Sequence, residues 1–491
     1  MILKPNMTLP LASSYNERGV AGFTNTVTNA LDQRKINSMY EVAQNAGTGG
    51  KTLYLVSRPG PAVESGSYGS SGQVGYLVSL KPGATSVAAS NAWVFSTSGN
   101  DIRASDTSTT TVIATASGYA PAYVEKTVIS GTETLLVQLR NASFAQTAWY
   151  STAIGMFTQI SDADFTGLTV KGKMEAVDGW TIALTSANQL RNSDINSIAN
   201  WNPANYITKQ ITQDIPVGLM RLNRLILAFG VETVEGFVNA GRTVGSPLQR
   251  VTNVHTTCGL ATVDLVGMTH YYAKLAGKLY FLGRLDGAKT VSLVGFDGQG
   301  FGKVSNPFID KILAERSVYS VNAVGVAGQA AIALALDLTT ATTQRWLMYF
   351  PAWNDWFEWQ STVYSPVNAQ GLHLGVDQNQ HKIYSFGTTD NFQDAGTSHT
   401  WTHQFKIPAN GNNRRRMPML SLVGDTARSA QAVNVQFSDD DGQNWSTART
   451  IDMTSQDKAI TRCGAFKSRM VRLSYTGSNQ VRLEKFAARV E

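Results

Sequence analysis

The sequence predicts an all-β protein. Its largest part is expected to be a β-propeller, with an N-terminal arm before it and a C-terminal β-sandwich-like or sheet-closing region after it. Three observations predict this class: short apolar-aromatic strands recur at similar intervals, helix signals are sparse, and the C-terminal part alternates polar and apolar residues. We expect the arm to span residues 1–30, the propeller 31–410 and the C-terminal β region 411–491.

The recurring strands are the main evidence for a propeller. They begin at Lys51, Ala92, Thr134, Gly179, Arg224, Lys278, Arg345 and Lys382. The first four intervals are 41 to 45 residues long, which matches the roughly 40 to 50 residues of a propeller blade. Each four-stranded blade buries its faces against its neighbours, so the repeat predicts one large modular fold, with other β-rich repeat folds as alternatives.

The segments around and within the repeat differ in character. The first thirty residues are polar and aperiodic, so we expect an extended arm that packs on a neighbour or on its own propeller. One helix is predicted over residues 306–316, where Asn306 suits the N-cap and Pro307 the first helical position. After a turn cluster at Gly411, alternating segments predict a small sandwich or a closing sheet.

The charge content favours an assembled protein over a dedicated DNA binder. Only 15% of the 491 residues are charged, against roughly 25% in typical soluble domains. Interface cores are depleted in charge, so neighbouring copies can cover much of this surface. The net charge of +6 permits contact with a polyanion, but it is spread too thinly to indicate DNA binding by itself.

The sequence carries no signal for secretion or membrane insertion. Pro5 and Pro10 interrupt the N-terminal ten residues, and no later apolar run is long enough to span a bilayer. Cys258 and Cys463 lie far apart and lack metal-site spacing, so we expect them to be reduced. These features are consistent with assembly in a cytoplasm.

The sharpest local motif is Ser438-Asp439-Asp440-Asp441-Gly442-Gln443-Asn444-Trp445. It resembles the S-x-D-x-G-x-x-W Asp box of sialidase-like propellers and several other β proteins. We expect a structural turn in which Ser438 and Asp440 cap backbone amides, Gly442 adopts a positive φ and Trp445 anchors the hairpin in the core. The box generally lies away from the active site in those families, so it does not indicate catalysis.

No set of residues predicts an enzyme. A glycosidase needs two working carboxylates, or a Tyr nucleophile with a cluster of arginines, at a pocket. Arg414, Arg415 and Arg416 are contiguous, and successive strand side chains point to opposite faces, so they do not form a convergent triad. We interpret them as a solvated or intersubunit loop, with phosphate contact to passing DNA as the second interpretation. No catalytic, cofactor-binding or metal-binding residue is predicted.

Three further motifs have structural interpretations. His399 and His403 flank Trp401, but four residues along a strand span about 13 Å, too far for one metal ion. The glycines of residues 298–302 predict a hairpin, because no helix follows to receive a pyrophosphate. The aromatic segment 353–359 could stack nucleic-acid bases, but a hairpin with core aromatics fits its turn residues better.

Three stretches, taken in order, resemble the tail nozzle or packaged-DNA stabilisation proteins of short-tailed phages, the podovirus tail accessory proteins. The most specific is NWNPANYITKQITQD followed by RLILAFGVETVEGFVNAG, within residues 200–241. SPLQRV, KLYFLGR and FDGQGFGKVSNPFIDKILA follow within residues 246–314, and FSDDDGQNWS with VRLSYTG completes the order. The resemblance covers residues 185–491, whereas the first half matches in general character, including KTLYLVSRPG at residues 51–60.

The resemblance implies a homohexameric ring of propeller subunits in the virion tail, assembled in the host cytoplasm. The ring would dock beneath the head-to-tail adaptor, meet tail spike, fibre or needle proteins, and retain double-stranded viral DNA until ejection. This role implies a structural protein without enzymatic activity or cofactor. A thinly charged lumen suits a conduit, because each neutralised phosphate would add affinity that hinders ejection. The alternative is a sialidase-like or glycan-binding propeller, which convergent Arg, Asp, Glu and Tyr side chains in a concave pocket would indicate.

Overall fold

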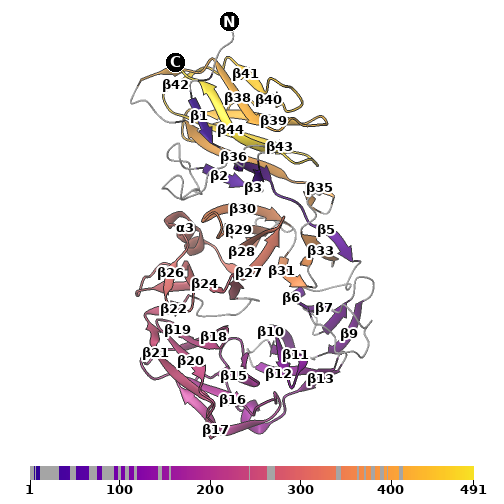
Figure 1. The fold of residues 1–491 in the computed structure, drawn as a ribbon, viewed down its shortest axis with the longest axis vertical. Helices are drawn as coiled ribbons and strands as arrows, with labels where there is room; N and C mark the ends of the chain where they lie inside the picture. Colours follow the sequence, from indigo (N-terminus) through magenta and orange to yellow (C-terminus); the bar gives the residue numbers. More distant parts are fainter. Residues whose placement is uncertain are drawn as a thin grey trace.

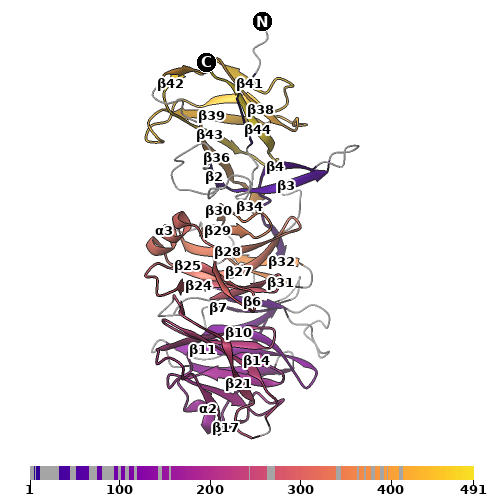
Figure 2. The same cartoon turned by 60° about the vertical axis from the view of Figure 1, so that its left-hand side comes forward.

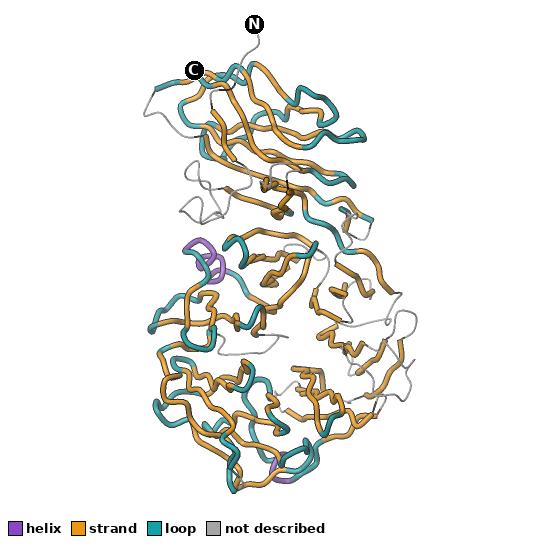
Figure 3. Tube along the Cα trace, in the orientation of Figure 1, coloured by secondary structure: helices purple, strands orange, loops and turns teal. Residues whose placement is uncertain are grey.

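The structure is a computed structural model. It describes residues 5, 7–10, 33–44, 51–65, 74–79, 93–97, 101–105, 110–115, 119–141, 146–153, 156–242, 244–261, 271–338, 344–361, 364–369, 372–377, 382–386, 392–394, 396–407 and 413–491. Strands dominate this part of the chain, which confirms the all-β prediction (Figure 3).

The described residues form seven blades of a β-propeller, arranged around a common axis (Figure 1). Blade 1 comprises β6 (Val74–Ser79), β7 (Trp93–Thr97), β8 (Asp101–Ser105) and β9 (Thr110–Thr115). Blade 2 comprises β10 (Tyr119–Ile129), β11 (Thr132–Asn141), β12 (Gln146–Ala153) and β13 (Met156–Gln159). Blade 3 comprises β14 (Glu175–Val177), β15 (Trp180–Leu184), β16 (Gln189–Ser193) and β17 (Trp201–Thr208). Blade 4 comprises β18 (Pro216–Leu222), β19 (Leu225–Gly230), β20 (Val234–Asn239) and β21 (Leu248–Thr256). Blade 5 comprises β22 (Cys258–Leu260), β23 (Tyr272–Leu275), β24 (Lys278–Leu285), β25 (Ser292–Phe296) and β26 (Phe301–Lys303), and both β22 and β23 pair with β24. Blade 6 comprises β27 (Val318–Val326), β28 (Gln329–Leu338), β29 (Gln344–Phe350) and β30 (Asp355–Ser361). Blade 7 comprises β31 (Tyr364–Ala369), β32 (Leu372–Asp377), β33 (Lys382–Phe386) and β5 (Ala62–Ser65).

The propeller closes by pairing strands from opposite ends of the sequence. Strand β5 completes blade 7 by pairing antiparallel with β33, so that Tyr384 lies opposite Val63. The innermost strands of neighbouring blades meet around the axis. Strands β31, β6 and β10 are neighbours there, as are β23, β27 and β31. A closed ring of blades removes most of the open sheet edges that a single extended sheet would expose.

The C-terminal region is a β-sandwich built from both ends of the chain (Figure 2). One sheet contains β3 (Ser38–Gln44), β4 (Lys51–Ser57), β38 (Met419–Gly424), β41 (Ala459–Thr461) and β44 (Arg482–Arg489), with β1 (Met7–Pro10) paired to β44. The other contains β2 (Gln33–Ile36), β36 (Thr400–Ile407), β39 (Ala432–Ser438), β40 (Arg449–Asp452) and β43 (Arg469–Thr476). Two short hairpin pairs complete the region: β34 (Gln393–Asp394) with β35 (Thr397–Ser398), and β37 (Arg415–Arg416) with β42 (Ala465–Phe466).

The sheets do not divide the chain at the expected boundaries. Residues 33–57 and 400–407 belong to the sandwich, although they were assigned to the propeller from the sequence. The propeller is therefore inserted between the two ends of the sandwich. The described part of the expected arm, β1, pairs with β44 of the sandwich and not with the propeller. These pairings join residues more than 300 positions apart, and local periodicity carries no information about such partners.

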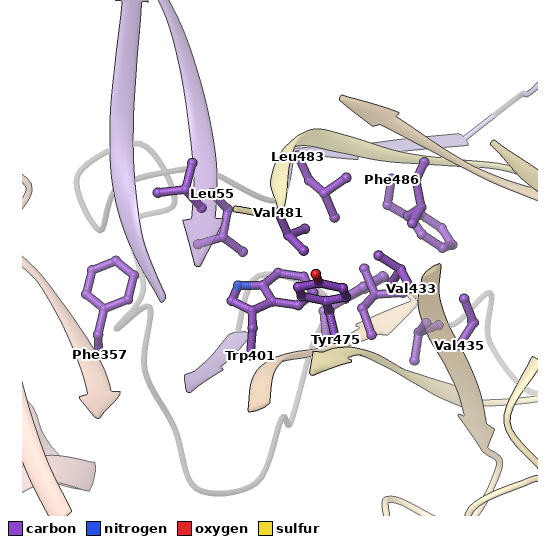
Figure 4. Close-up of a cluster of buried hydrophobic side chains, with 14 of the residues drawn as sticks. Leu55, Phe357, Trp401, Val433, Val435, Tyr475, Val481, Leu483 and Phe486 are labelled. Atoms are coloured by element: carbon purple, nitrogen blue, oxygen red, sulfur yellow. The ribbon is translucent and has the colours of Figure 1, made fainter. Parts of the chain in front are cut away.

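One sheet runs without interruption from the propeller into the sandwich. The outer strand of blade 6, β30, pairs parallel with β2, which pairs with β36, so nine strands form one sheet. The main hydrophobic core follows this sheet across the boundary, from Trp346 and Phe357 in blade 6 to Trp401 and Phe486 in the sandwich. Figure 4 shows Phe357, Trp401 and Phe486 among the side chains of this core. The two parts therefore share buried apolar surface as well as backbone hydrogen bonds.

The expected repeat is present, but its members differ in position. The strands at Ala92, Thr134, Gly179, Arg224 and Lys278 correspond to the second strand along each blade, whereas those at Arg345 and Lys382 correspond to the third. The first member, at Lys51, is β4 of the sandwich and not a blade strand. The irregular late intervals follow from this change of position and from helix α3 (Pro307–Glu315) before blade 6.

The two helices among the described residues are short. Asn306 caps α3 as predicted, because its side chain accepts from the amides of Phe308 at 3.1 Å and Ile309 at 2.9 Å. A second helix, α2 (Ala163–Thr166), was not predicted; Asp162 caps it. A single helical turn is too short to produce a recognisable helical period.

Candidate functional site

The first candidate site is the joint between propeller and sandwich, which we define by Lys35, Arg58, Asp355, Glu358 and Asp394. The chain crosses this joint twice, leaving the sandwich after β4 and returning through β34. Arg58 lies on the outgoing crossing and is fully buried. Its guanidinium donates to both carboxylate oxygens of Asp394 on the returning crossing, at 2.8 and 2.6 Å. A bidentate pair of this kind fixes the relative position of the two crossings.

Further contacts bring the two crossings and the propeller rim together. Arg58 also donates to the Asn37 side chain at 3.0 Å and to the backbone oxygen of Gln360, in β30, at 2.5 Å. A Cβ atom on Gly60 would lie 2.0 Å from the backbone oxygen of Gln393. Only glycine allows the outgoing and returning backbones to approach so closely.

A second buried ion pair lies where β2 joins blade 6. Lys35 Nζ is 2.5 Å from Asp355 Oδ2, and the side chains are 0% and 1% exposed. The Tyr40 hydroxyl donates to the same oxygen at 2.7 Å, and the other oxygen of Asp355 accepts from the Trp356 amide at 2.8 Å. Because both carboxylate oxygens have donors, the desolvation cost of the pair is offset by specific hydrogen bonds.

The second candidate site is a charged cluster on or next to the innermost strands of blades 2 to 5. We call it the axis cluster, and it is made of Glu125, Lys173, Glu175, Arg221 and Tyr272, with Lys173 two residues before β14. Lys173 donates to Glu125, and the Tyr272 hydroxyl donates to the fully buried Glu175. Arg221 approaches both carboxylates, at 3.6 Å from Glu125 and 3.8 Å from Glu175. Four blades thus contribute to one network around the axis.

The pKa values of the two glutamates of the axis cluster are shifted in opposite directions. Burial alone would raise the pKa of Glu125, but Lys173 and the neighbouring cations outweigh it and lower the pKa below its ordinary value. Burial, aided by the nearby charge of Glu125, raises the pKa of Glu175 despite Lys173. Burial and Glu175 also hold the pKa of Tyr272 well above its ordinary value. A pair of buried carboxylates sharing one lysine produces such a split.

The three predicted arginines do not form one surface loop. Arg415 and Arg416 form the two-residue strand β37, and the Arg415 guanidinium lies 5.4 Å from the centre of the Phe466 ring. The backbone of Arg416 exchanges hydrogen bonds with Glu491 at 2.7 and 2.8 Å. Arg414 and Arg416 are exposed, whereas Arg415 is half-buried. Two of the three side chains are thus open to solvent on the sandwich, away from both candidate sites.

The Asp-box residues come together in a turn of the sandwich that follows β39. The Ser438 hydroxyl accepts from the Gly442 amide at 2.8 Å, Asp440 accepts from the Asn444 amide at 2.9 Å, and φ of Gly442 is +90°. The Asn444 amide and the Ser438 hydroxyl lower the pKa of Asp440 to about 2. Trp445 is half-buried and was expected in the core; the Arg472 guanidinium covers its ring at 3.7 Å from the centre.

The other sequence motifs have structural positions. His403 is fully buried between Trp401 and Phe405, and the described residues contain no cluster that could hold a metal ion. The glycine-rich segment forms the β25–β26 hairpin, and the aromatic segment forms the β29–β30 hairpin with Trp356 and Trp359 buried, as predicted. Cys258 and Cys463 are buried and are not joined to one another. No helix in the described part of the chain is apolar and long enough to cross a bilayer.

Sequence reasoning missed both candidate sites. The partners in the joint are separated by 320 positions for Lys35 and Asp355 and by 336 for Arg58 and Asp394. The one available signal was the SRPG end of the segment at residues 51–60, which contains Arg58 and Gly60. The axis cluster draws one or two residues from each of four blades, so no compact motif marks it.

Several solved structures resemble this chain remotely. BamB from Moraxella catarrhalis is 11% identical, with a TM-score of 0.37, over 73% of this chain and 98% of its own. An ancestral GH74 enzyme is 9% identical, with a TM-score of 0.40, over 71% of this chain and 56% of its own. A computationally designed protein is 8% identical, with a TM-score of 0.38, over 66% of this chain and 99% of its own. No curated protein sequence matches the chain.

A family model gives a more informative match. The model described as "Bacteriophage P22 Gp10, beta-propeller" matches residues 48–342, which is more than half of the chain. The matched range begins just before β4 and includes Arg58 of the joint, the whole axis cluster, and blades 1 to 5. The seven-bladed architecture agrees with the propeller that the family description names. The chain therefore belongs to the phage-stabilisation family of Bacteriophage P22 Gp10 and is a phage DNA-stabilisation β-propeller protein.

Proposed function

We propose that this protein forms the tail nozzle of a short-tailed phage, as a homohexameric ring beneath the head-to-tail adaptor that retains packaged DNA until ejection. The family match over residues 48–342 carries the proposal, because it assigns the propeller to phage DNA stabilisation. In this role the protein acts mechanically in the virion tail and carries out no covalent chemistry. Tail spike, fibre or needle proteins would attach to the same assembly, which would be built in the host cytoplasm.

The joint gives the subunit the stiffness that this role needs. DNA packed in a head presses on whatever closes the exit, so a retaining ring must resist hinge motion within each subunit. Here one sheet and one hydrophobic core cross from the propeller into the sandwich, and the buried pairs Lys35–Asp355 and Arg58–Asp394 hold the crossings. A large apolar interface with buried hydrogen bonds opposes the relative motion that small polar interdomain contacts allow.

The surface charge suits a conduit that does not grip DNA. Tight retention by many phosphate contacts would give a steep salt dependence and slow release. Of the three consecutive arginines, Arg414 and Arg416 are exposed, and they are the residues that we propose as weak contacts to passing DNA. Two cations per subunit, repeated around a ring, would steer the duplex along the axis without a continuous basic groove.

The test uses purified tailless, DNA-filled heads and the purified full-length protein. The proposal predicts that about six copies join each particle and that DNA leakage falls, measured by particle mass and by nuclease-accessible DNA. The variant with Arg414 and Arg416 both changed to Gln should still bind and should change only the salt dependence of ejection. A protein that ignores the heads and leaves leakage unchanged would contradict the nozzle proposal.

The glycan alternative has a separate readout. Its sequence signal, the Asp box, lies in the sandwich and not in a propeller blade, so it does not mark a sialidase-like blade turn. Incubation with the host surface polysaccharide, followed by analysis of released reducing ends and of retained polymer, tests hydrolysis and binding together. Turnover or saturable binding by the monomer would favour the alternative over the nozzle.

A further inference from the structure

Most of the exposed large apolar side chains belong to blades 3 and 4 and to the loops of these two blades. Seven large hydrophobic side chains are exposed among the described residues, and five of them fall within residues 195–244. Three follow one another at the end of blade 3 and in the connection to blade 4: Tyr206 is 41% exposed, Ile211 46% and Ile215 67%. We call these three the rim patch. Isolated exposed hydrophobics need no explanation, but such clustering in one segment marks an interaction surface.

Two buried carboxylates hold the connection that carries the isoleucines. Glu235 is fully buried and accepts from the amides of Ile211 at 2.9 Å and Gln210 at 3.3 Å. Asp214 accepts from the amide of Thr233 at 2.8 Å and from its hydroxyl at 3.0 Å. The segment is therefore fixed against blade 4 at both ends. The backbone of the segment is held before a partner binds, so the positions of the exposed isoleucines are preorganised for contact.

The rim patch lies beside an open sheet edge, in a segment whose own charged side chains are buried. Strand β17 is the outer strand of blade 3, and no other described strand pairs with its outer side. Residues 195–215 contain only two charged residues, Lys209 and Asp214. Their charged atoms are 3.8 Å apart, and their side chains are 0% and 5% exposed. The segment that carries the two isoleucines therefore presents no exposed charged side chain of its own, and the neighbouring cation is Arg191, whose guanidinium lies 4.7 Å from the centre of the Tyr206 ring.

We infer that the rim patch is the face through which one copy of this chain contacts the next copy in the ring, an inference that rests on the proposed nozzle function. Each copy carries a net charge of +6, so contact between copies is favoured where neither presents charge. A closed ring needs a heterologous face on every subunit, and an apolar patch on rigid backbone supplies one.

The same features disfavour other occupants. A polyanion such as DNA needs exposed cations, and the only lysine in residues 195–215 is buried in an ion pair. A glycan platform needs a free aromatic face, but the Arg191 guanidinium lies 4.7 Å from the centre of the Tyr206 ring. The two exposed isoleucines offer an aliphatic surface, which fits a protein partner.

The experiment compares two surface variants on tailless, DNA-filled heads. The double variant Ile211→Gln/Ile215→Gln should keep the melting temperature of the isolated protein. Its rings, however, should dissociate at a protein concentration at least tenfold higher than the concentration at which wild-type rings dissociate, because each interface loses two buried isoleucines. The control Val128→Gln, at a side chain that is 54% exposed on blade 2, should assemble like the wild type.

A photo-crosslinking residue at position 215 of the assembled particle identifies the partner directly. Cross-linked peptides from a second copy of this chain support the inference. Cross-links to a head or other tail protein, or full rings formed by the double variant, overturn it and leave the nozzle proposal intact. A wild-type protein that never joins the heads overturns the nozzle proposal and this inference with it.

Discussion

Removing the lysine from the buried pair in the joint should destabilise the protein strongly. The substitution Lys35→Met keeps the length and apolar stem of the side chain but removes the Lys35 ammonium from Asp355, which is 1% exposed. Breaking a buried pair by removing one partner costs about 3 to 5 kcal/mol, because an uncompensated charge stays buried. The unfolding equilibrium constant should therefore rise by a factor of roughly 10² to 10⁴.

Urea unfolding followed by tryptophan fluorescence measures this effect, because Trp356, Trp359 and Trp401 are buried near the joint. The matched control is Lys51→Met, the same change at an exposed end of β4, which should stay within about 0.5 kcal/mol of the wild type. The double variant Lys35→Met/Asp355→Asn should recover much of the loss, because no charge is then left unpaired. If Lys35→Met behaves like Lys51→Met, the pair does not hold the joint and the reasoning is refuted.

Three further predictions concern pH and backbone packing. The pKa of Asp440 is lowered to about 2 in the folded protein, so its ionised carboxylate stabilises the fold above the ordinary pKa of an aspartate, and this stabilisation is lost as pH falls towards 2. Asp440→Asn should therefore lower the melting temperature at pH 7 and leave it unchanged near pH 2. The control Asp457→Asn should leave the melting temperature unchanged at both pH values. Burial, with help from the Arg58 guanidinium, lowers the pKa of His399 to about 3, so the protein should lose stability as pH falls from about 6.5 to 3, and His399→Gln should flatten that dependence in thermal melts. A Cβ atom on Gly259 would lie 1.7 Å from the backbone oxygen of Val231, whereas a Cβ atom on Gly302 meets nothing within 4 Å. Gly259→Ala should thus lower the free energy of unfolding in urea by about 1 to 3 kcal/mol, with Gly302→Ala as the control. Equal unfolding midpoints for the two variants would contradict the packing argument.

The motifs that the sequence predicted correctly depend on neighbouring residues. The Asn306 cap is complete within three positions, and the Asp-box hydrogen bonds are complete within four. The β29–β30 hairpin likewise pairs residues across one short turn. Each of these features is encoded by residues that are close in the chain, so reading the sequence locally is sufficient.

The expectation for Trp445 failed for a physical reason that lies outside its own motif. The turn forms with local bonds, but the position of the indole depends on what the neighbouring strand offers. Strand β43 presents Arg472, whose guanidinium stacks on the ring, so the indole stays half-buried at the surface. The motif fixes the turn, whereas the adjacent sheet decides the surroundings of its aromatic residue.

The expected boundaries of the propeller, at residues 31 and 410, were wrong because strands near both of them belong to the sheets of the sandwich. The reason is related. Alternating residues show that β2, β3 and β4 are strands, but they do not show which sheet receives them. Pairing with β30, β36 and β44 requires closing loops of several hundred residues, and the partners are chosen by burial of the shared core. The insertion of the propeller within the sandwich is therefore a property of the folded chain.

The sequence by itself determined the all-β class, the propeller repeat, the local turns and caps, and the resemblance to phage DNA-stabilisation proteins. Strand periodicity and turn chemistry act between near neighbours, so each remains readable in the linear chain. Only the tertiary structure decided the seven blades, the closure of blade 7 by β5, the joint around Arg58 and Lys35, and the axis cluster. These depend on contacts between distant residues, where burial of charge and of apolar surface selects one pairing among many that the same local pattern allows.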